Sequence, residues 1–303
     1  MQSSRATYDG EAVRTGISAR VRGYVQLVKP RLTLLVVFSA IFGYMMAPNV
    51  HGFDAWTVLA LGLGGFLITG ASNTLNQVIE AEHDRMMTRT QNRPMARQVL
   101  APVEAIIFAL ACGAAGITIL GVVFGGLVPA LLGVIALLLY AFVYTPMKRI
   151  HSVAVLIGAI PGAMPPLIGW AAATGTLGPE AMVLFLVQFL WQFPHFWAIA
   201  WVLEDDYKKA GFKMLPADAG RTGFTASIIL VYTFLLVPVA ILPYSMGIAG
   251  AFTSILIALT GIGFTILSWL LLKTRTMKAA SRVMFGSFIY LPVIQIAMLI
   301  DKF

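Results

Sequence analysis

Nine apolar runs fill most of this 303-residue sequence and limit what it can fold into. Each run is about 17 to 25 residues long, the length that an α-helix needs to cross roughly 30 Å of hydrocarbon. The chain is 59% hydrophobic and only 11% charged, whereas about a quarter of the residues in a soluble domain are charged. We therefore predict an all-α polytopic membrane protein, a single bundle of nine transmembrane helices. The runs lie at 31–47, 56–79, 105–124, 127–146, 153–173, 181–203, 224–243, 249–272 and 283–300.

The positive charges alternate from loop to loop along the chain. When the loops are assigned to the two sides in turn, twenty of the 21 Lys and Arg residues fall on one side, and only Lys302 falls on the other. Since cytoplasmic loops carry the excess of positive charge, the N-terminus and the even-numbered loops are predicted to be cytoplasmic. The net charge of +8 is thereby assigned to membrane topology, and nucleic acid is not an expected partner.

The chain is expected to consist of a cytoplasmic tail, 1–30, and one transmembrane domain, 31–303. The tail is basic and has no long apolar segment, so it is not a secretory signal. A transit peptide is the alternative, but Asp9 and Glu11 count against it. We accordingly expect a bacterial plasma (inner) membrane, with the mitochondrial inner membrane as the alternative.

An acidic cluster follows the second apolar run, in the stretch NQVIEAEHDRMMTRTQNRP, 76–94. Asn76, Glu80 and Asp84 are spaced by four residues, which places them along one face of a helix. Two carboxylates at this spacing repel each other, and a hard cation would remove the repulsion. Mg²⁺ typically binds one or two protein carboxylates together with waters and phosphate oxygens. These three side chains are therefore candidate Mg²⁺ ligands.

Three arginines, Arg85, Arg89 and Arg93, repeat the four-residue spacing one position further on. Their forked donors suit phosphate oxygens, so the cluster is consistent with a metal-bound diphosphate. The alternative is a solvated, salt-bridged helix end of a carrier or channel. A transporter would more often place its ionisable residues near the middle of the spans, and here they lie at span ends.

At these residues the sequence resembles a known family. The pattern N-x-x-x-[D/E]-x-x-x-D-R, followed by R-T-x-N-R-P, is similar to the first acidic motif of the UbiA-type intramembrane prenyltransferases. The resemblance implies a UbiA-like helical bundle that binds a polyprenyl diphosphate through Mg²⁺. Glu80 stands where the family usually has Asp, which keeps the charge and lengthens the side chain.

Five further stretches are similar to the branch of this family that farnesylates haem. That resemblance implies farnesyl diphosphate and haem B as substrates, haem O for haem-copper terminal oxidases as product, and haem A synthase or oxidase assembly proteins as possible partners. A sister enzyme with an aromatic acceptor such as 4-hydroxybenzoate is the alternative within the family. The stretches are KPRLTLL at 29–35, YTPMKR at 144–149, IGAIPGAMPPLIGW at 157–170, WQFPHFW at 191–197 and DYKKAGFKMLP at 206–216.

The glycines and prolines at 158–169 are expected to interrupt the fifth span. Irregular backbone at membrane depth is tolerated where it lines a cavity, so a pocket beside this helix is expected, with a close helix crossing through small residues as the alternative. On the sixth span, His195 lies among aromatic residues that include Trp191 and Trp197. A histidine inside a span is usually functional, and we expect these three residues to bind the haem. For His195 the alternatives are a hydrogen bond to a neighbouring helix or a contact with a haem propionate without chemistry, and for the tryptophans the alternative is packing in the core or against lipid.

The second cytoplasmic cluster lies in the loop at 204–223, four spans after the first cluster and hence on the same face. The resemblance implies that Asp206 assists the metal, that other residues of this loop bind substrate, and that the basic pair at the end of the fourth span does the same. Surface charge without a role is the alternative for each basic residue. The residues assigned to substrate in this way are Lys148, Arg149, Tyr207, Lys209 and Lys213.

Overall fold

The computed structural model describes residues 16–52 and 54–302, and these residues form an all-helical bundle. Nine of its helical segments are long and apolar enough to span a membrane, which confirms the predicted number for the described part of the chain. The elements are α1 (Ile17–Val28), α2 (Pro30–Met46), α3 (Ala55–Ile79), α4 (Ala81–Met86), α5 (Pro102–Val123), α6 (Leu127–Leu138), a π-helical turn (Leu139–Tyr144), α7 (Thr145–Ile150), α8 (Ala154–Thr174), α9 (Pro179–Val202), α10 (Glu204–Lys209), a 3₁₀ turn (Pro216–Asp218), α11 (Gly223–Val239), α12 (Leu242–Ser245), α13 (Ala251–Thr274) and α14 (Met277–Ile300).

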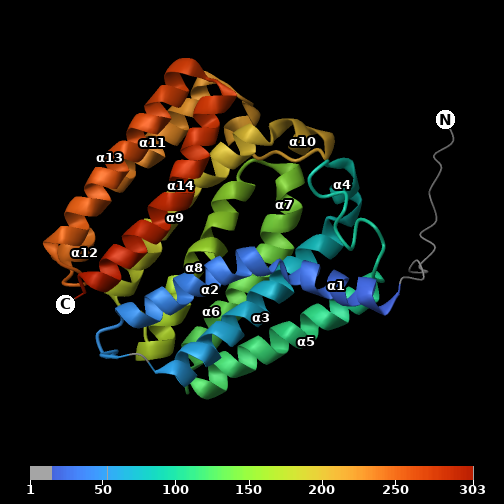
Figure 1. Ribbon diagram of the computed structural model, residues 1–303, viewed down its shortest axis with the longest axis horizontal. Helices are drawn as coiled ribbons and strands as arrows, with labels where there is room; N and C mark the ends of the chain where they lie inside the picture. The colour runs from blue at the N-terminus through green and yellow to red at the C-terminus, as the bar shows by residue number, and fades with distance from the viewer. Residues whose placement is uncertain (1–15, 53, 303) are drawn as a thin grey trace.

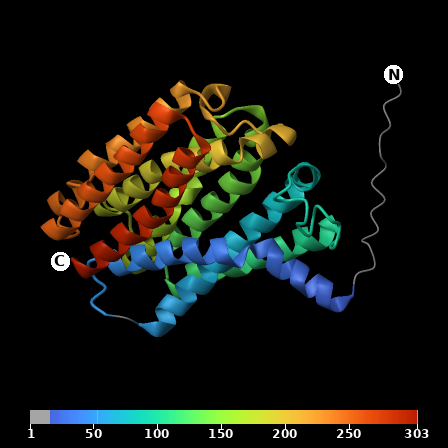
Figure 2. The ribbon, with the colours of Figure 1, turned by 45° about the horizontal axis from the view of Figure 1, so that its top comes forward.

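The bundle is arranged around α8. In the span Ala154–Thr174, 78% of an apolar stretch of 18 residues is buried inside the protein, compared with 22% for the span Pro102–Val123, which forms α5. The helices α2, α3, α5 and α6 lie on one side of α8, and α9, α11, α13 and α14 lie on the other (Figure 1, Figure 2). A residue that points inward from α8 therefore contacts protein rather than lipid.

The expected interruption of the fifth span is wrong, because α8 is one continuous helix with Pro161, Pro165 and Pro166 inside it. Pro166 has no N–H and cannot bond to the carbonyl four residues earlier. Gln188 of α9 replaces that donor, with its Nε2 atom 2.8 Å from the carbonyl oxygen of Gly162. Neighbouring helices can satisfy backbone groups that prolines leave free in a membrane, and this contact keeps α8 helical.

The glycines of α8 allow helices to pack closely. A Cβ added at Gly169 would overlap the carbonyl oxygen of Ala40 in α2, and one at Gly43 of α2 would overlap the carbonyl oxygen of Pro166. At Gly162 an added Cβ would overlap the side chain of Gln192. The alternative of a close helix crossing through small residues is therefore what the structure has at these positions.

The segment before the first predicted span is partly helical. Residues Ile17–Val28 form α1, which joins α2 through Lys29 in the left-handed conformation (φ 49°). Pro30 occupies the first turn of α2, where its missing N–H costs nothing. The assignment of 1–30 to a cytoplasmic tail stays a prediction, and residues 1–15 lie outside the described part of the chain.

Candidate functional site

Two carboxylates are buried together at the end of α3 and in α4. Glu80 is 4% exposed and Asp84 is fully buried, while the amide side chain of Asn76 lies one turn earlier and is 2% exposed. The backbone N–H of Glu80 donates to the carbonyl of Asn76, and that of Asp84 donates to the carbonyl of Glu80. The helical register therefore continues across the α3–α4 junction, and the three side chains follow one another turn by turn as the spacing predicts.

Each member of this row is held by a cation. Lys148 of α7 lies 2.8 Å from Oε1 of Glu80, and Arg93 donates to both carboxylate oxygens of Asp84 at 2.8 Å. Lys29 donates to Oδ1 of Asn76 at 3.2 Å. These cations remove the carboxylate repulsion that the sequence pattern implied. Cationic side chains next to both carboxylates favour an anionic ligand at this site.

Lys29 is a member of the site that the sequence interpretation did not assign. It is close enough to Glu80, Asp84, Arg93 and Lys148 to interact electrostatically with all four. The sequence contained one indication of this role: Lys29 stands immediately before the first long apolar run and is followed by proline. This combination places a cation at the membrane end of a helix. Its pairing with Asn76 depends on the approach of α2 to α3, which no local pattern specifies.

The three arginines of the first loop do not share one helix face, because α4 ends at Met86. The Nε atom of Arg85 donates to the carbonyl of Ala96 at 2.8 Å and so holds the loop together. Arg93 is the one that returns to the carboxylates. Arg89 lies in the turn after α4, where its backbone N–H contacts the second loop.

The loop after α4 and the loop that contains α10 meet at Asp206. Its carboxylate accepts from the backbone N–H groups of Thr88 at 3.4 Å and Arg89 at 3.2 Å, and from Lys209 at 3.1 Å. The Lys209 hydrogen bond is the main reason that the pKa of Asp206 lies below its usual value. In the structure Asp206 therefore contacts the first loop, and α4 and α10 lie side by side (Figure 1, Figure 2).

The remaining candidates for substrate binding lie around the loops that border the site. Lys213 forms a 3.5 Å ion pair with Asp218, and its backbone N–H donates to the carbonyl of Lys148 at 2.7 Å. The Tyr207 ring lies 6.2 Å from that of Phe212. Arg149 is exposed and forms no ion pair within the described residues.

His195 lies on α9 with both of its expected aromatic neighbours on the same helix. Its ring stacks on Trp191 with a centroid distance of 4.5 Å, and the Nδ1 atom lies 2.8 Å from the hydroxyl of Ser287 on α14. Trp197 is 7% exposed and packs against Tyr232 of α11, so it faces a different neighbour. The structure therefore brings His195 and Trp191 together and places Trp197 in the adjoining core.

The donor atoms at the end of α3 suit Mg²⁺ in number and type. Within the described residues, no three acidic, histidine or cysteine side chains converge to hold a metal by themselves. Mg²⁺ does not require such a cage, because it commonly uses one or two carboxylates and takes waters and substrate phosphates for the rest. Glu80 and Asp84 could supply that pair, and Arg93 and Lys148, which lie beside them, could bind phosphate oxygens.

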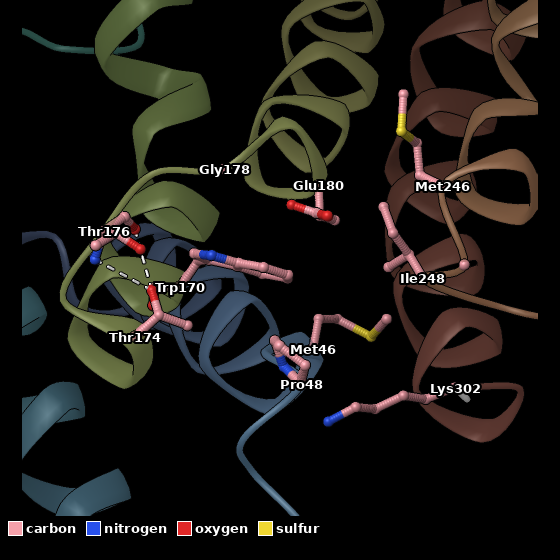
Figure 3. Close-up of a pocket in the computed structure, with 11 residues that line it drawn as sticks. Met46, Pro48, Trp170, Thr174, Thr176, Gly178, Glu180, Met246, Ile248 and Lys302 are labelled. Atoms are coloured by element: carbon pink, nitrogen blue, oxygen red, sulfur yellow. Dashed lines mark hydrogen bonds between the residues drawn. The ribbon is translucent and has the colours of Figure 1, made fainter.

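A cavity of about 400 Å³ lies at the opposite end of the bundle from the carboxylates. Trp170 and Met46 form part of its wall, and the Glu180 side chain lies across the cavity from them (Figure 3). Lys302 also lines it, but its Nζ atom donates to the carbonyls of Met45, Ala47 and Val50 at 2.7–2.8 Å. Lys302 thus satisfies backbone groups at and beyond the end of α2.

Known proteins match this chain over most of its length. Residues 36–291 match the UbiA prenyltransferase family. The chain belongs to the UbiA prenyltransferase family. Among the relatives in this family is the protoheme IX farnesyltransferase of Cytophaga hutchinsonii, which is 46% identical over 94% of this chain and 99% of its own length. The protein of the same name from Flavobacterium psychrophilum is 40% identical over 92% of this chain and 94% of its own length.

Solved structures of UbiA proteins share the fold. A digeranylgeranylglyceryl phosphate synthase covers 93% of this chain and 98% of its own, with a TM-score of 0.77 and 22% identity. A UbiA homologue from Archaeoglobus fulgidus bound to GPP and Mg²⁺ covers 91% of this chain and 99% of its own, with a TM-score of 0.64 and 16% identity. At these identities the likeness establishes a common UbiA architecture.

Proposed function

We propose that this protein transfers the farnesyl group of farnesyl diphosphate to a vinyl group of haem B and that water adds to give haem O. The observation that carries the proposal is the buried pair Glu80 and Asp84, ringed by Lys29, Arg93 and Lys148 at one membrane end of the bundle. This is a donor site for a metal-bound diphosphate. The haem acceptor is supported by relatives of 40–46% identity that are named for it.

In the donor site, Glu80 and Asp84 would hold Mg²⁺, with Asn76 and Asp206 as the further ligands that we propose. When bound, Mg²⁺ supplies positive charge that stabilises the leaving diphosphate. Arg93 and Lys148 would exchange their carboxylate contacts for phosphate oxygens, and Arg85, Arg89, Lys209 and Lys213 would approach from the loops. Fixed cations aimed at the developing negative charge lower the barrier to breaking the allylic C–O bond.

The acceptor step needs no nucleophile from the protein. The C1 carbon of the farnesyl cation bonds to the terminal carbon of a haem vinyl group, which leaves a cation on the vinyl carbon attached to the porphyrin. Water adds to that carbon and loses a proton, so the product carries one farnesyl and one hydroxyl group, and diphosphate is released. The task of the protein is to orient the two substrates and to shield the cation.

Haem extracts test this function directly. Cells that lack their own haem O activity are compared with and without this protein, and the pyridine haemochrome spectrum and the mass of the extracted haem are measured. We expect haem O only in the cells that contain the protein. An unchanged haem pool would contradict the proposal.

His195→Ala is expected to lower haem affinity and haem O formation while leaving farnesyl diphosphate binding unchanged. The physical reason is position: His195 lies on α9 seven residues before its end at Val202, roughly 10 Å of helix at 1.5 Å per residue, and so lies deeper in the bundle than the loop that contains Asp206. Equilibrium binding measurements with haem B and with farnesyl diphosphate show which of the two affinities the substitution lowers. Normal haem affinity with weakened diphosphate binding would move His195 into the donor site.

We further propose that the protein lies in a bacterial plasma membrane with its N-terminus in the cytoplasm. Nine spans then place the C-terminus on the opposite side, so a reporter fused after Phe303, which lies outside the described residues, should give a periplasmic signal. A cytoplasmic signal would contradict the count or the orientation. Transfer of the product to haem A synthase or oxidase assembly proteins stays a prediction.

A further inference from the structure

Ser287 of α14 is the residue that joins His195 to the rest of the bundle. Its hydroxyl lies 2.8 Å from Nδ1 of His195, and its backbone carbonyl accepts from the indole N–H of Trp191 at 2.9 Å. Ser287 is fully buried. Ser287 thus forms a hydrogen bond with both Trp191 and His195 of α9, and these two bonds fix the position of the stacked rings.

The hydrogen atoms at this contact can be assigned by counting them. A serine hydroxyl has a single hydrogen, and that of Ser287 donates to the carbonyl of Met284 at 2.5 Å. We assign the hydroxyl hydrogen to this shorter contact, so that Ser287 accepts from His195 and the proton of a neutral imidazole lies on Nδ1. The Nε2 atom then carries a lone pair and no hydrogen.

The surroundings of the ring favour the neutral form that this assignment requires. Phe196 and Phe288 flank His195 at centroid distances of 5.3 and 5.2 Å, in addition to the stacked Trp191. Within the described residues no carboxylate pairs with His195. A charged imidazolium among aromatic rings without a counter-ion would be costly. The described residues also give Nε2 no hydrogen-bond partner.

We propose that Ser287 is a positioning residue that holds His195 in the Nδ1–H tautomer, so that Nε2 serves as an axial ligand to the haem iron. This inference rests on the proposed function, because it takes haem as the acceptor. A histidine that binds a metal almost always donates its other N–H to a partner in the protein, which fixes the ring and the tautomer. Ser287 has that relationship to His195.

The proposal also separates two roles for His195. A ring without a hydrogen on Nε2 cannot donate a proton from that atom to the reacting vinyl group, whereas it can bind iron. Ligation from α9 would hold the haem at a fixed depth relative to the diphosphate site. The vinyl group that reacts is then selected by how the ring is rotated about the Fe–Nε2 bond.

The test uses the full-length protein in detergent or nanodiscs, titrated with haem B. In the ferrous complex we expect an Fe–His stretching band in the resonance Raman spectrum. Ser287→Ala removes the acceptor for Nδ1–H, and should weaken haem binding about 10- to 100-fold and shift or broaden that band. Ser287→Thr keeps a hydroxyl and should restore both readouts. His195→Ala should lose the band, and added imidazole should restore an Fe–imidazole band.

Ser268→Ala is the matched control, because Ser268 is another fully buried serine, on α13, whose hydroxyl has no hydrogen-bond partner among the described residues. It should leave affinity and spectrum unchanged. A wild-type Fe–His band and affinity in Ser287→Ala, or a band that persists in His195→Ala without imidazole, would overturn the inference. Haem O formation by a protein with no Fe–His band would overturn it and leave the proposed function standing. An Fe–His band in a protein that transfers no farnesyl group would support the inference and contradict the proposed function.

Discussion

Replacing Asp84 by Asn is expected to lower the rate of farnesyl transfer by about 10²- to 10³-fold. The substitution keeps the shape of the side chain and one oxygen, but it removes the negative charge that Mg²⁺ needs. Glu80→Asp keeps its charge and should retain part of the activity, because a shorter carboxylate can still reach the metal or one of its waters. Turnover with purified protein, farnesyl diphosphate, haem B and Mg²⁺ gives the measurement.

Asp84 also pairs with Arg93, so a loss of activity must be separated from a loss of structure. Thermal unfolding in detergent, measured on the same samples, makes that separation. The matched control is Glu104→Gln, which breaks a 2.6 Å ion pair with Arg20 whose two side chains are each 35% exposed. Exposed pairs contribute little, so this variant should keep its activity. Full activity of Asp84→Asn, or of the wild type in excess chelator, would contradict the metal-diphosphate assignment.

Gly169→Leu is expected to prevent the bundle from assembling, with a loss of about 3 kcal/mol of stability. The first added carbon would overlap the carbonyl oxygen of Ala40, so α2 and α8 would have to separate along their crossing. Separation would also disturb the Gly43 contact with Pro166 in the same interface. The yield of monodisperse protein and its unfolding temperature measure the effect.

Gly263→Leu is the control for that substitution. Gly263 is an exposed glycine of α13, and a Cβ added there would meet nothing within 4 Å. The same change in a transmembrane helix should therefore be tolerated at this position. Equal stability of the two leucine variants would show that the α2–α8 crossing is not the close contact described above.

The sequence was sufficient to predict the helices because membrane insertion imposes one simple rule, an apolar run of fixed length. It was also sufficient for the row formed by Asn76, Glu80 and Asp84, because a four-residue spacing has a local meaning in any helix. The continuity of α8 could not be predicted, since the donor that replaces the missing N–H of Pro166 comes from Gln188 on another helix.

The cations of the site were predictable as residue types but not as partners. Lys148 and Arg93 come from segments that follow Glu80 and Asp84 by 68 and 9 residues, and Lys29 precedes Asn76 by 47. The packing of α2 and α7 on α3 brings Lys29 and Lys148 to the row, and the fold of the loop between α4 and α5 returns Arg93 to Asp84. The contact of Asp206 with the backbone of Thr88 and Arg89 could not be predicted either, because these residues lie 117–118 positions from it in the sequence.

Reconstitution with defined acceptors tests the central claim most directly. Purified protein in liposomes is supplied with farnesyl diphosphate and Mg²⁺, and with either haem B or 4-hydroxybenzoate, and the products are identified by mass spectrometry. We predict a haem that has gained one farnesyl group and one hydroxyl, with no farnesylated 4-hydroxybenzoate. Farnesylation of 4-hydroxybenzoate with haem B left unchanged would place this protein with the aromatic prenyltransferases and contradict the account.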